Sequence, residues 1–199
     1  MTTKRQVLNR GFALLAALSL ATAGVLAGQQ AAPDKEKADD AAAVKEFTVH
    51  VNEYLKLRKT IEKRLPAMKS KEELPEMIAA HQQALARKIR EARPNAKPGD
   101  IFTHPTSEAF KHLIREAYQD PERNTKSAVA QQRLTVKEFP LHVNGIYPDA
   151  VAETTIPTTL LQKLPTLSDE LAYRIVGRDL VLVDRKANLV VDLLHEALP

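Results

Sequence analysis

Three residues, His104, Glu108 and His112, follow one another at four-residue steps, the spacing that places side chains on one face of a helix. Two imidazoles and a carboxylate are a minimal ligand set for a transition metal. His104, however, precedes Pro105, and the residue before a proline is biased away from helical backbone angles. We therefore expect no metal site, interpret His112 as a solvated helix residue, and leave open whether the three converge in the fold.

Three acidic residues, Asp179, Asp184 and Asp192, stand at the ends of predicted strands or in turns. Two carboxyl groups that face one cleft can hydrolyse glycosides as general acid and base. Aspartate is also favoured in turns, because its side chain accepts hydrogen bonds from nearby backbone N–H groups. We interpret all three as turn residues, and the sequence predicts no catalytic residue.

Composition excludes several other kinds of site. The chain of 199 residues has no cysteine, which removes thiol catalysis and cysteine-based zinc or iron–sulfur centres. Its six glycines are too dispersed to form a phosphate-binding loop or a dinucleotide fingerprint. No serine has the flanking glycines of a nucleophile elbow. The sequence therefore indicates no cofactor.

The first 27 residues have the pattern of a secretory signal peptide. Lys4, Arg5 and Arg10 precede an uncharged stretch, residues 11–27, that ends in small residues. Cleavage after Ala23 or Ala27 would give a periplasmic or secreted protein, and the alternative is an uncleaved anchor in the inner membrane. The stretch is at the lower limit of length for a membrane-spanning helix.

The basic character of the whole chain comes from this segment. The isoelectric point of about 9.2 points to nucleic acid as a partner. Three of the 29 basic residues and none of the 25 acidic residues lie in the signal segment, so the remainder is nearly neutral. The basic stretches 56–64 and 87–97 complement the dipoles of two predicted helices. We expect an unknown protein or envelope component as partner, no nucleic acid, and a membrane only through an uncleaved signal segment.

Helical periodicity begins after a polar stretch. Residues 28–40 contain no large apolar side chain and are predicted to be a flexible tether. A first helix runs from Ala41 to Pro66, and a second begins at Ser70 or Pro75 and ends before Pro94. Their short connection predicts an antiparallel helical hairpin. The expected buried stripe of the second helix is Leu74, Ile78, His81, Leu85 and Ile89.

A third helix begins at Pro105, and β-branched runs follow near the end of the chain. Residues 171–176, 179–184 and 189–193 are separated by turn signals, Gly177-Arg178 and residues 185–188, which predicts a three-stranded antiparallel meander. Such a meander is hardly stable alone and should pack on the helices. The expected fold is a single α+β domain over residues 41–199.

The segment from Tyr173 to Asp192, of the form YRxVGRDLxLxDxxANLxVD, resembles a family of uncharacterised exported bacterial proteins. The segments 96–103 and 147–148 share in this resemblance, which covers most of the chain after the signal segment. It implies an exported, bacterial, single-domain protein and assigns no activity, cofactor or catalytic residue.

These observations favour an accessory or interaction protein of the cell envelope over an enzyme. The alternative is a small periplasmic hydrolase whose residues converge only in the fold. A pocket that collects two or more of the candidate acids and histidines would favour the hydrolase.

The signal peptide leads to the first prediction. The mature chain should begin near Gly24 or Gly28 and lie outside the cytoplasm. Mass spectrometry of the native protein measures this directly. An intact mass from Met1 to Pro199 in a membrane fraction would establish the uncleaved anchor instead.

Overall fold

The computed structural model describes residues 31–67, 74–119, 127, 129, 140–148 and 156–199. The side chains of residues 31–34 are not described. Along the chain the elements are α1 (Ala31–Glu62), α2 (Pro75–Ala92), α3 (His104–Gln119), α5 (Thr158–Leu161), β1 (Leu171–Val176), β2 (Asp179–Asp184) and β3 (Leu189–Leu194). The predicted α+β class, with helices first and a C-terminal sheet, is confirmed.

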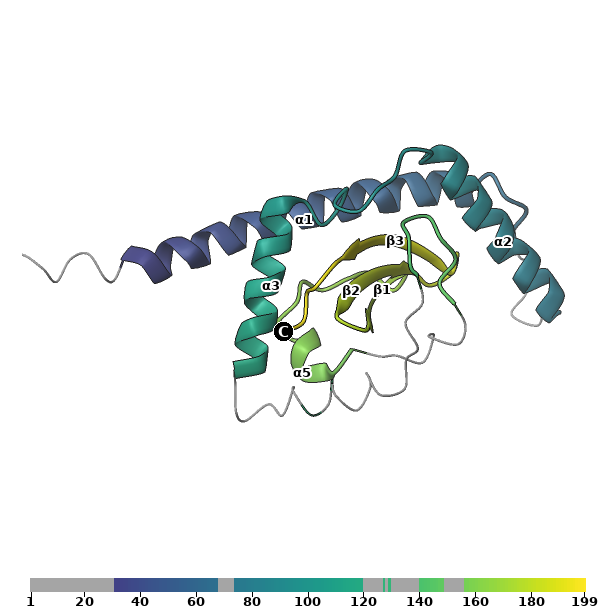
Figure 1. Cartoon of the computed structure of the whole chain (residues 1–199). Coiled ribbons are helices and arrows are strands. Elements are labelled where there is room, and N and C mark those ends of the chain that lie inside the picture. Colours follow the sequence, from purple (N-terminus) through teal and green to yellow (C-terminus); the bar gives the residue numbers. More distant parts are fainter. Residues whose placement is uncertain (1–30, 68–73, 120–126, 128, 130–139, 149–155) are drawn as a thin grey trace, which may run out of the picture.

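The helices surround one side of the sheet. α1 is the longest of the described helices. It forms the predicted helical hairpin with α2, and α3 follows as the third helix (Figure 1). The contact between α1 and α3 is more extensive than the contact between α1 and α2. Proline at the first position of α2 suits a helix start, because its missing N–H is not needed there. Of the two predicted starts for this helix, Pro75 is therefore correct, and Ser70 lies outside the described residues.

The three strands pair in sequence order as an antiparallel meander, as predicted. Gly177 has φ +62°, a left-handed conformation that glycine adopts without strain, and it lies in the tight turn between β1 and β2. A register shift lies between Leu182 and Val183 in the pairing of β2 with β3. The outer edge of β3 is paired at its start, where Asn144 and Tyr147 donate backbone hydrogen bonds to the carbonyl groups of Val190 and Asn188.

Each face of the sheet packs on its own apolar cluster. On the helix side, the rings of Phe47, Phe102, Phe110 and Tyr173 lie 4.8 to 6.3 Å apart between centroids in the pairs that touch. These four rings come from α1, the loop before α3, α3 and β1. The opposite face carries a smaller cluster, which consists of Val143, Tyr147, Val176, Val181, Val183, Val190 and Leu193. The main core is thus shared between the helices and the sheet.

Residues 31–40 differ from the predicted flexible tether, because they form the first turns of α1. Alanine, lysine and glutamate are good helix formers. In addition, Asp40 and Glu36 form ion pairs with His112 of α3. Polar contacts to a neighbouring helix hold this part of α1, so the absence of large apolar residues was not a sufficient sign of a tether. Residues 28–30 lie outside the described residues.

The predicted buried stripe of α2 is correct only in its second half. Leu85 and Ile89 are fully buried, whereas Leu74 and Ile78 are 64% and 46% exposed. His81, expected in the core, is half-buried. The reason is positional: only the C-terminal half of α2 approaches α1 and the sheet (Figure 1).

Among the described helices, none combines the length and apolar character that crossing a membrane requires.

Candidate functional site

Asp184 links the first helix to the sheet. Its carboxylate is fully buried. One oxygen, Oδ2, accepts hydrogen bonds from the Tyr54 hydroxyl at 2.9 Å and from Arg58 Nε at 2.7 Å. The other, Oδ1, accepts the backbone N–H groups of Lys186 and Ala187 at 3.0 and 2.9 Å. The side chain therefore closes the turn after β2 and at the same time binds α1.

The electrostatics of this cluster keep its donors protonated. Burial, and then the charge of Asp184, raise the pKa of the Tyr54 hydroxyl well above its ordinary value. Burial lowers the pKa of Arg58, but Asp184 and Glu62 outweigh that effect and raise it overall. Arg58 also donates to Glu62 at 2.8 Å, and Lys186 reaches the other oxygen of Glu62 at 3.1 Å. Because every oxygen of Asp184 is occupied, this acid acts as a structural anchor.

Asp192 performs a similar task for a different loop. It lies within β3, is fully buried, and accepts four backbone N–H groups, those of Gly99, Ile101, Phe102 and Leu193, at 2.7 to 3.0 Å. Burial raises the pKa of this carboxyl group, and the four amide donors counteract that rise. Asp192 thereby fixes the segment that leads into α3.

The third acid, Asp179, accepts the backbone N–H of Glu196 at 2.9 Å and contacts His195 Nδ1 at 2.9 Å. The interpretation of the three acids as hydrogen-bond acceptors for turns and loops is thus supported, although Asp192 lies inside a strand rather than at a turn. Asp184 and Asp192 are both fully buried, and their oxygens are engaged with protein donors. They do not form a general acid and base pair on a cleft.

The three residues of the candidate metal pattern lie in different environments in the fold. His104 is the exposed first residue of α3, and Glu108 is also exposed. His112 is half-buried, and its Nδ1 lies 2.5 Å from Asp40, with Glu36 at 3.4 Å and Glu116 at 4.0 Å from Nε2. His112 is therefore a bridge from α3 to α1, not a solvated helix residue. No group of three or more metal-binding side chains occurs within the described ranges.

Glu108 and His112 nevertheless line one shallow hollow, together with Lys35, Glu36, Asp39, Asp40 and Arg115. By the test set out above, such a gathering favours a hydrolase. The contacts of His112 argue against it: Asp40 binds Nδ1 and Glu36 lies 3.4 Å from Nε2, so carboxylates already face both ring nitrogens. The hydrogen bond to Asp40 raises the pKa of His112, burial acts in the opposite sense, and the charges of Asp40, Glu36 and Glu116 add to the rise.

The basic stretches at the helix ends are partly used inside the fold. Arg58 is buried on Asp184. Arg93 lies over the ring of Tyr54, 5.2 Å from its centroid, and donates to the carbonyl of Val191. The ion pairs of Arg87 and Lys88 are with Glu91 of the same helix.

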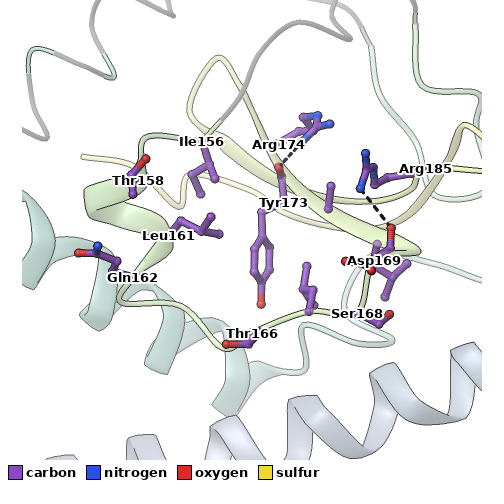
Figure 2. Close-up of a pocket in the computed structure, with 13 residues that line it drawn as sticks. Ile156, Thr158, Leu161, Gln162, Thr166, Ser168, Asp169, Tyr173, Arg174 and Arg185 are labelled. Carbon is purple, nitrogen blue, oxygen red and sulfur yellow. Dashed lines mark hydrogen bonds between the residues drawn. The ribbon is translucent and has the colours of Figure 1, made fainter.

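The structure contains a groove that the sequence did not indicate. We call it the β1 groove; its volume is about 420 Å³. Its walls are Ile156, Thr158, Leu161 and Gln162 on one side, residues 166–169 along the bottom, and residues 171–174 with Arg185 on the other side (Figure 2). The Tyr173 ring points into the groove, and its hydroxyl donates to the Pro165 carbonyl at 3.0 Å. Burial strongly raises the pKa of this hydroxyl.

The groove follows an unpaired strand edge. β1 pairs with β2 alone among the described strands. The N–H of Arg185 donates to the carbonyl of Glu170, and in an antiparallel ladder such bonded pairs recur at every second residue. The backbone groups of Ala172 and Arg174 therefore face β2, while those of Tyr173 and Ile175 face outward.

Sequence reasoning missed this groove for a physical reason. Its walls come from α5, the loop after it, β1 and the residue after β2, so no local spacing joins them. The strand order of the meander is the one usable signal, because it places β1 at an edge of the sheet.

Comparison of the chain with models of known protein families, with curated proteins and with solved structures finds no match. The resemblance to a family of exported bacterial proteins stays a prediction.

The four hydrogen bonds to Asp192 predict a large cost for their loss. Asp192→Ala leaves several buried N–H groups without an acceptor, at about 1–3 kcal/mol each, and should lower the free energy of unfolding by at least about 3 kcal/mol. Asp179→Ala is the matched control, since it loses exposed bonds only, and should cost about 1 kcal/mol. Denaturant unfolding measures both. Equal losses in the two variants would contradict the anchor role.

The pairing of His112 predicts a dependence of stability on pH. Its folded pKa is raised, so its contribution is fully present below the unfolded pKa and is lost as pH rises through the folded pKa. His112→Gln should therefore destabilise the protein more at about pH 5.5 than at about pH 9. His81→Gln, at a half-buried site on α2, is the control. A His112→Gln difference that does not change with pH, measured by denaturant unfolding, would refute the pairing.

Proposed function

We propose that the protein is an exported interaction protein of the cell envelope, and that its β1 groove binds an extended segment of another protein by strand addition. The observation that carries the proposal is the coincidence of a groove with the outward-facing backbone of β1. A peptide that lies along β1 would continue the sheet. In this mode of recognition, backbone hydrogen bonds provide affinity and side-chain pockets provide specificity.

The groove offers both kinds of contact. The N–H groups of Tyr173 and Ile175 face outward, where an incoming strand needs donors. Beside them, Ile156, Leu161 and Leu167 form an apolar wall, and Leu161 is 44% exposed. An exposed apolar side chain beside a free strand edge favours a ligand that brings its own apolar side chains.

The rival function, a small periplasmic hydrolase, has weaker support. Asp184 and Asp192 are buried and fully hydrogen-bonded, and Asp179 is held by the C-terminal turn. Glu108 and His112 share a hollow, but the imidazole there is engaged by Asp40. A binding role needs no catalytic group and is compatible with all of these placements.

The test uses hexapeptides selected against the whole protein from a random library. A selected peptide should bind with a dissociation constant on the order of 10 µM, and the amide exchange of Tyr173 and Ile175 should slow in the complex. The same peptide with N-methyl groups at alternate residues should bind at least about tenfold more weakly, because it cannot complete the ladder.

A pair of variants locates the binding. Leu161→Asp places a charge on the apolar wall and should weaken binding about tenfold, whereas Met77→Asp changes a similarly exposed side chain on α2 and should have no effect. The absence of any binding peptide would refute the proposal. Equal affinity of the N-methylated peptide would refute strand addition.

A further inference from the structure

The two sides of the β1 groove differ in chemistry. Successive side chains of a strand point to opposite faces of the sheet. Leu171 and Tyr173 therefore point toward the helix-side core, where the apolar wall lies. Ala172 and Arg174 point to the other face. Arg185, which follows β2, extends on the same side as Arg174 and away from the Tyr173 ring (Figure 2).

Both arginines on this second side have charges that no carboxylate of the described residues neutralises. Arg174 Nη1 donates to the carbonyl of Tyr173 at 3.0 Å, and Arg185 Nη1 donates to the carbonyl of Asp169 at 3.3 Å. These partners are neutral carbonyl groups, and neither arginine forms an ion pair with a described residue. Ala172 lies between the two along this face, and its small side chain leaves room beside them.

Two acidic residues, Asp169 and Glu170, directly precede β1 and bear on the net charge of this side of the groove. Glu170 does not line the groove, and a hydrogen bond from Ser168, with smaller effects of the charges of Arg58 and Lys186, lowers the pKa of its carboxyl group. Asp169 lies on the groove rim and is exposed. Among the described residues that line the groove, two positive charges thus accompany one negative charge, and this second side is electropositive.

We infer that the segment bound by the β1 groove alternates apolar and acidic residues. The inference rests on the proposed strand addition. In a strand placed along β1, every second side chain would lie on the apolar wall, and the residues between would lie beside Arg174 and Arg185. Carboxylates there would form charge-assisted hydrogen bonds with two guanidinium groups whose partners among the described residues are neutral carbonyl groups.

Binding would also exchange one hydrogen bond for two. Arg174 occupies the outward-facing carbonyl of Tyr173 in the free protein. A ligand N–H would take over that carbonyl, and the released guanidinium would then bind a ligand carboxylate. An acidic residue in the ligand therefore compensates for the bond that strand addition breaks.

The experiment measures, by isothermal titration, how tightly four acetylated hexapeptide amides bind to the whole protein. VEVEVE should bind about tenfold more tightly than the neutral VQVQVQ, and more tightly still than VKVKVK. VVVEEE, which has the composition of VEVEVE without its alternation, should bind at least about tenfold more weakly than VEVEVE.

Charge variants identify the residues responsible. The double variant Arg174→Gln with Arg185→Gln should reduce the preference for VEVEVE over VQVQVQ to less than about twofold. Arg87→Gln removes one positive charge from an exposed position on α2, outside the groove, and should leave the preference intact.

The outcomes separate this inference from the proposed function. Equal binding of VEVEVE and VQVQVQ to the unaltered protein would overturn the acidic preference and leave strand addition standing. Equal binding of VEVEVE and VVVEEE would overturn the alternation. If none of these peptides and no library peptide binds, the proposed function fails, and the inference fails with it.

Discussion

The buried carboxylate of Asp184 fixes how the sheet sits on the helices. It joins Tyr54 and Arg58 of α1 to the turn after β2, across more than 120 residues of chain. A buried charge that loses a partner is strongly unfavourable, so any arrangement that displaces β2 from α1 carries a large penalty. Apolar contacts between α1 and the sheet are not directional in this way. The ion pair need not add much net stability in order to select one orientation.

This orientation determines which edge of the sheet is available. β2 is the central strand, with β1 and β3 on either side of it, and Asp184 attaches this central strand to α1. The segment 140–148 hydrogen-bonds to the outer edge of β3. β1 pairs with β2 alone among the described strands, and Arg185, the residue that follows Asp184, is placed at the rim of its groove. The anchor and the proposed binding surface are therefore two consequences of one turn.

Local patterns predicted the elements of this fold well, and long-range polar contacts account for the failures. Period and turn chemistry predicted α3 and all three strands, because these features depend on residues close in sequence. Arg58 was interpreted as part of a basic helix end, although it lies one turn after Tyr54 on the buried face. Its partner Asp184 is too distant in sequence for any local spacing to reveal.

The predicted tether failed for the same reason. The first ten described residues of α1 are held through Asp40 and Glu36 by an imidazole on α3, not by apolar burial. The β1 groove was missed because its walls come from four separate segments. A sequence can show that β1 is an edge strand, but the apolar wall beside it exists only after α5 has packed.

An unpaired strand edge can pair with the same edge of a second copy of the protein. Arg174 opposes such pairing. Its guanidinium covers the Tyr173 carbonyl, which is one of the acceptors that another edge would need. Two β1 edges paired antiparallel about this point would also bring the Arg174 side chains of both copies close together, and like charges across a strand pair are unfavourable. The same positive charge that opposes self-association favours a ligand with carboxylates at those positions. Arg174 thus opposes pairing of β1 with a second copy of the protein and favours a partner segment with acidic residues. This gives selectivity without a closed pocket.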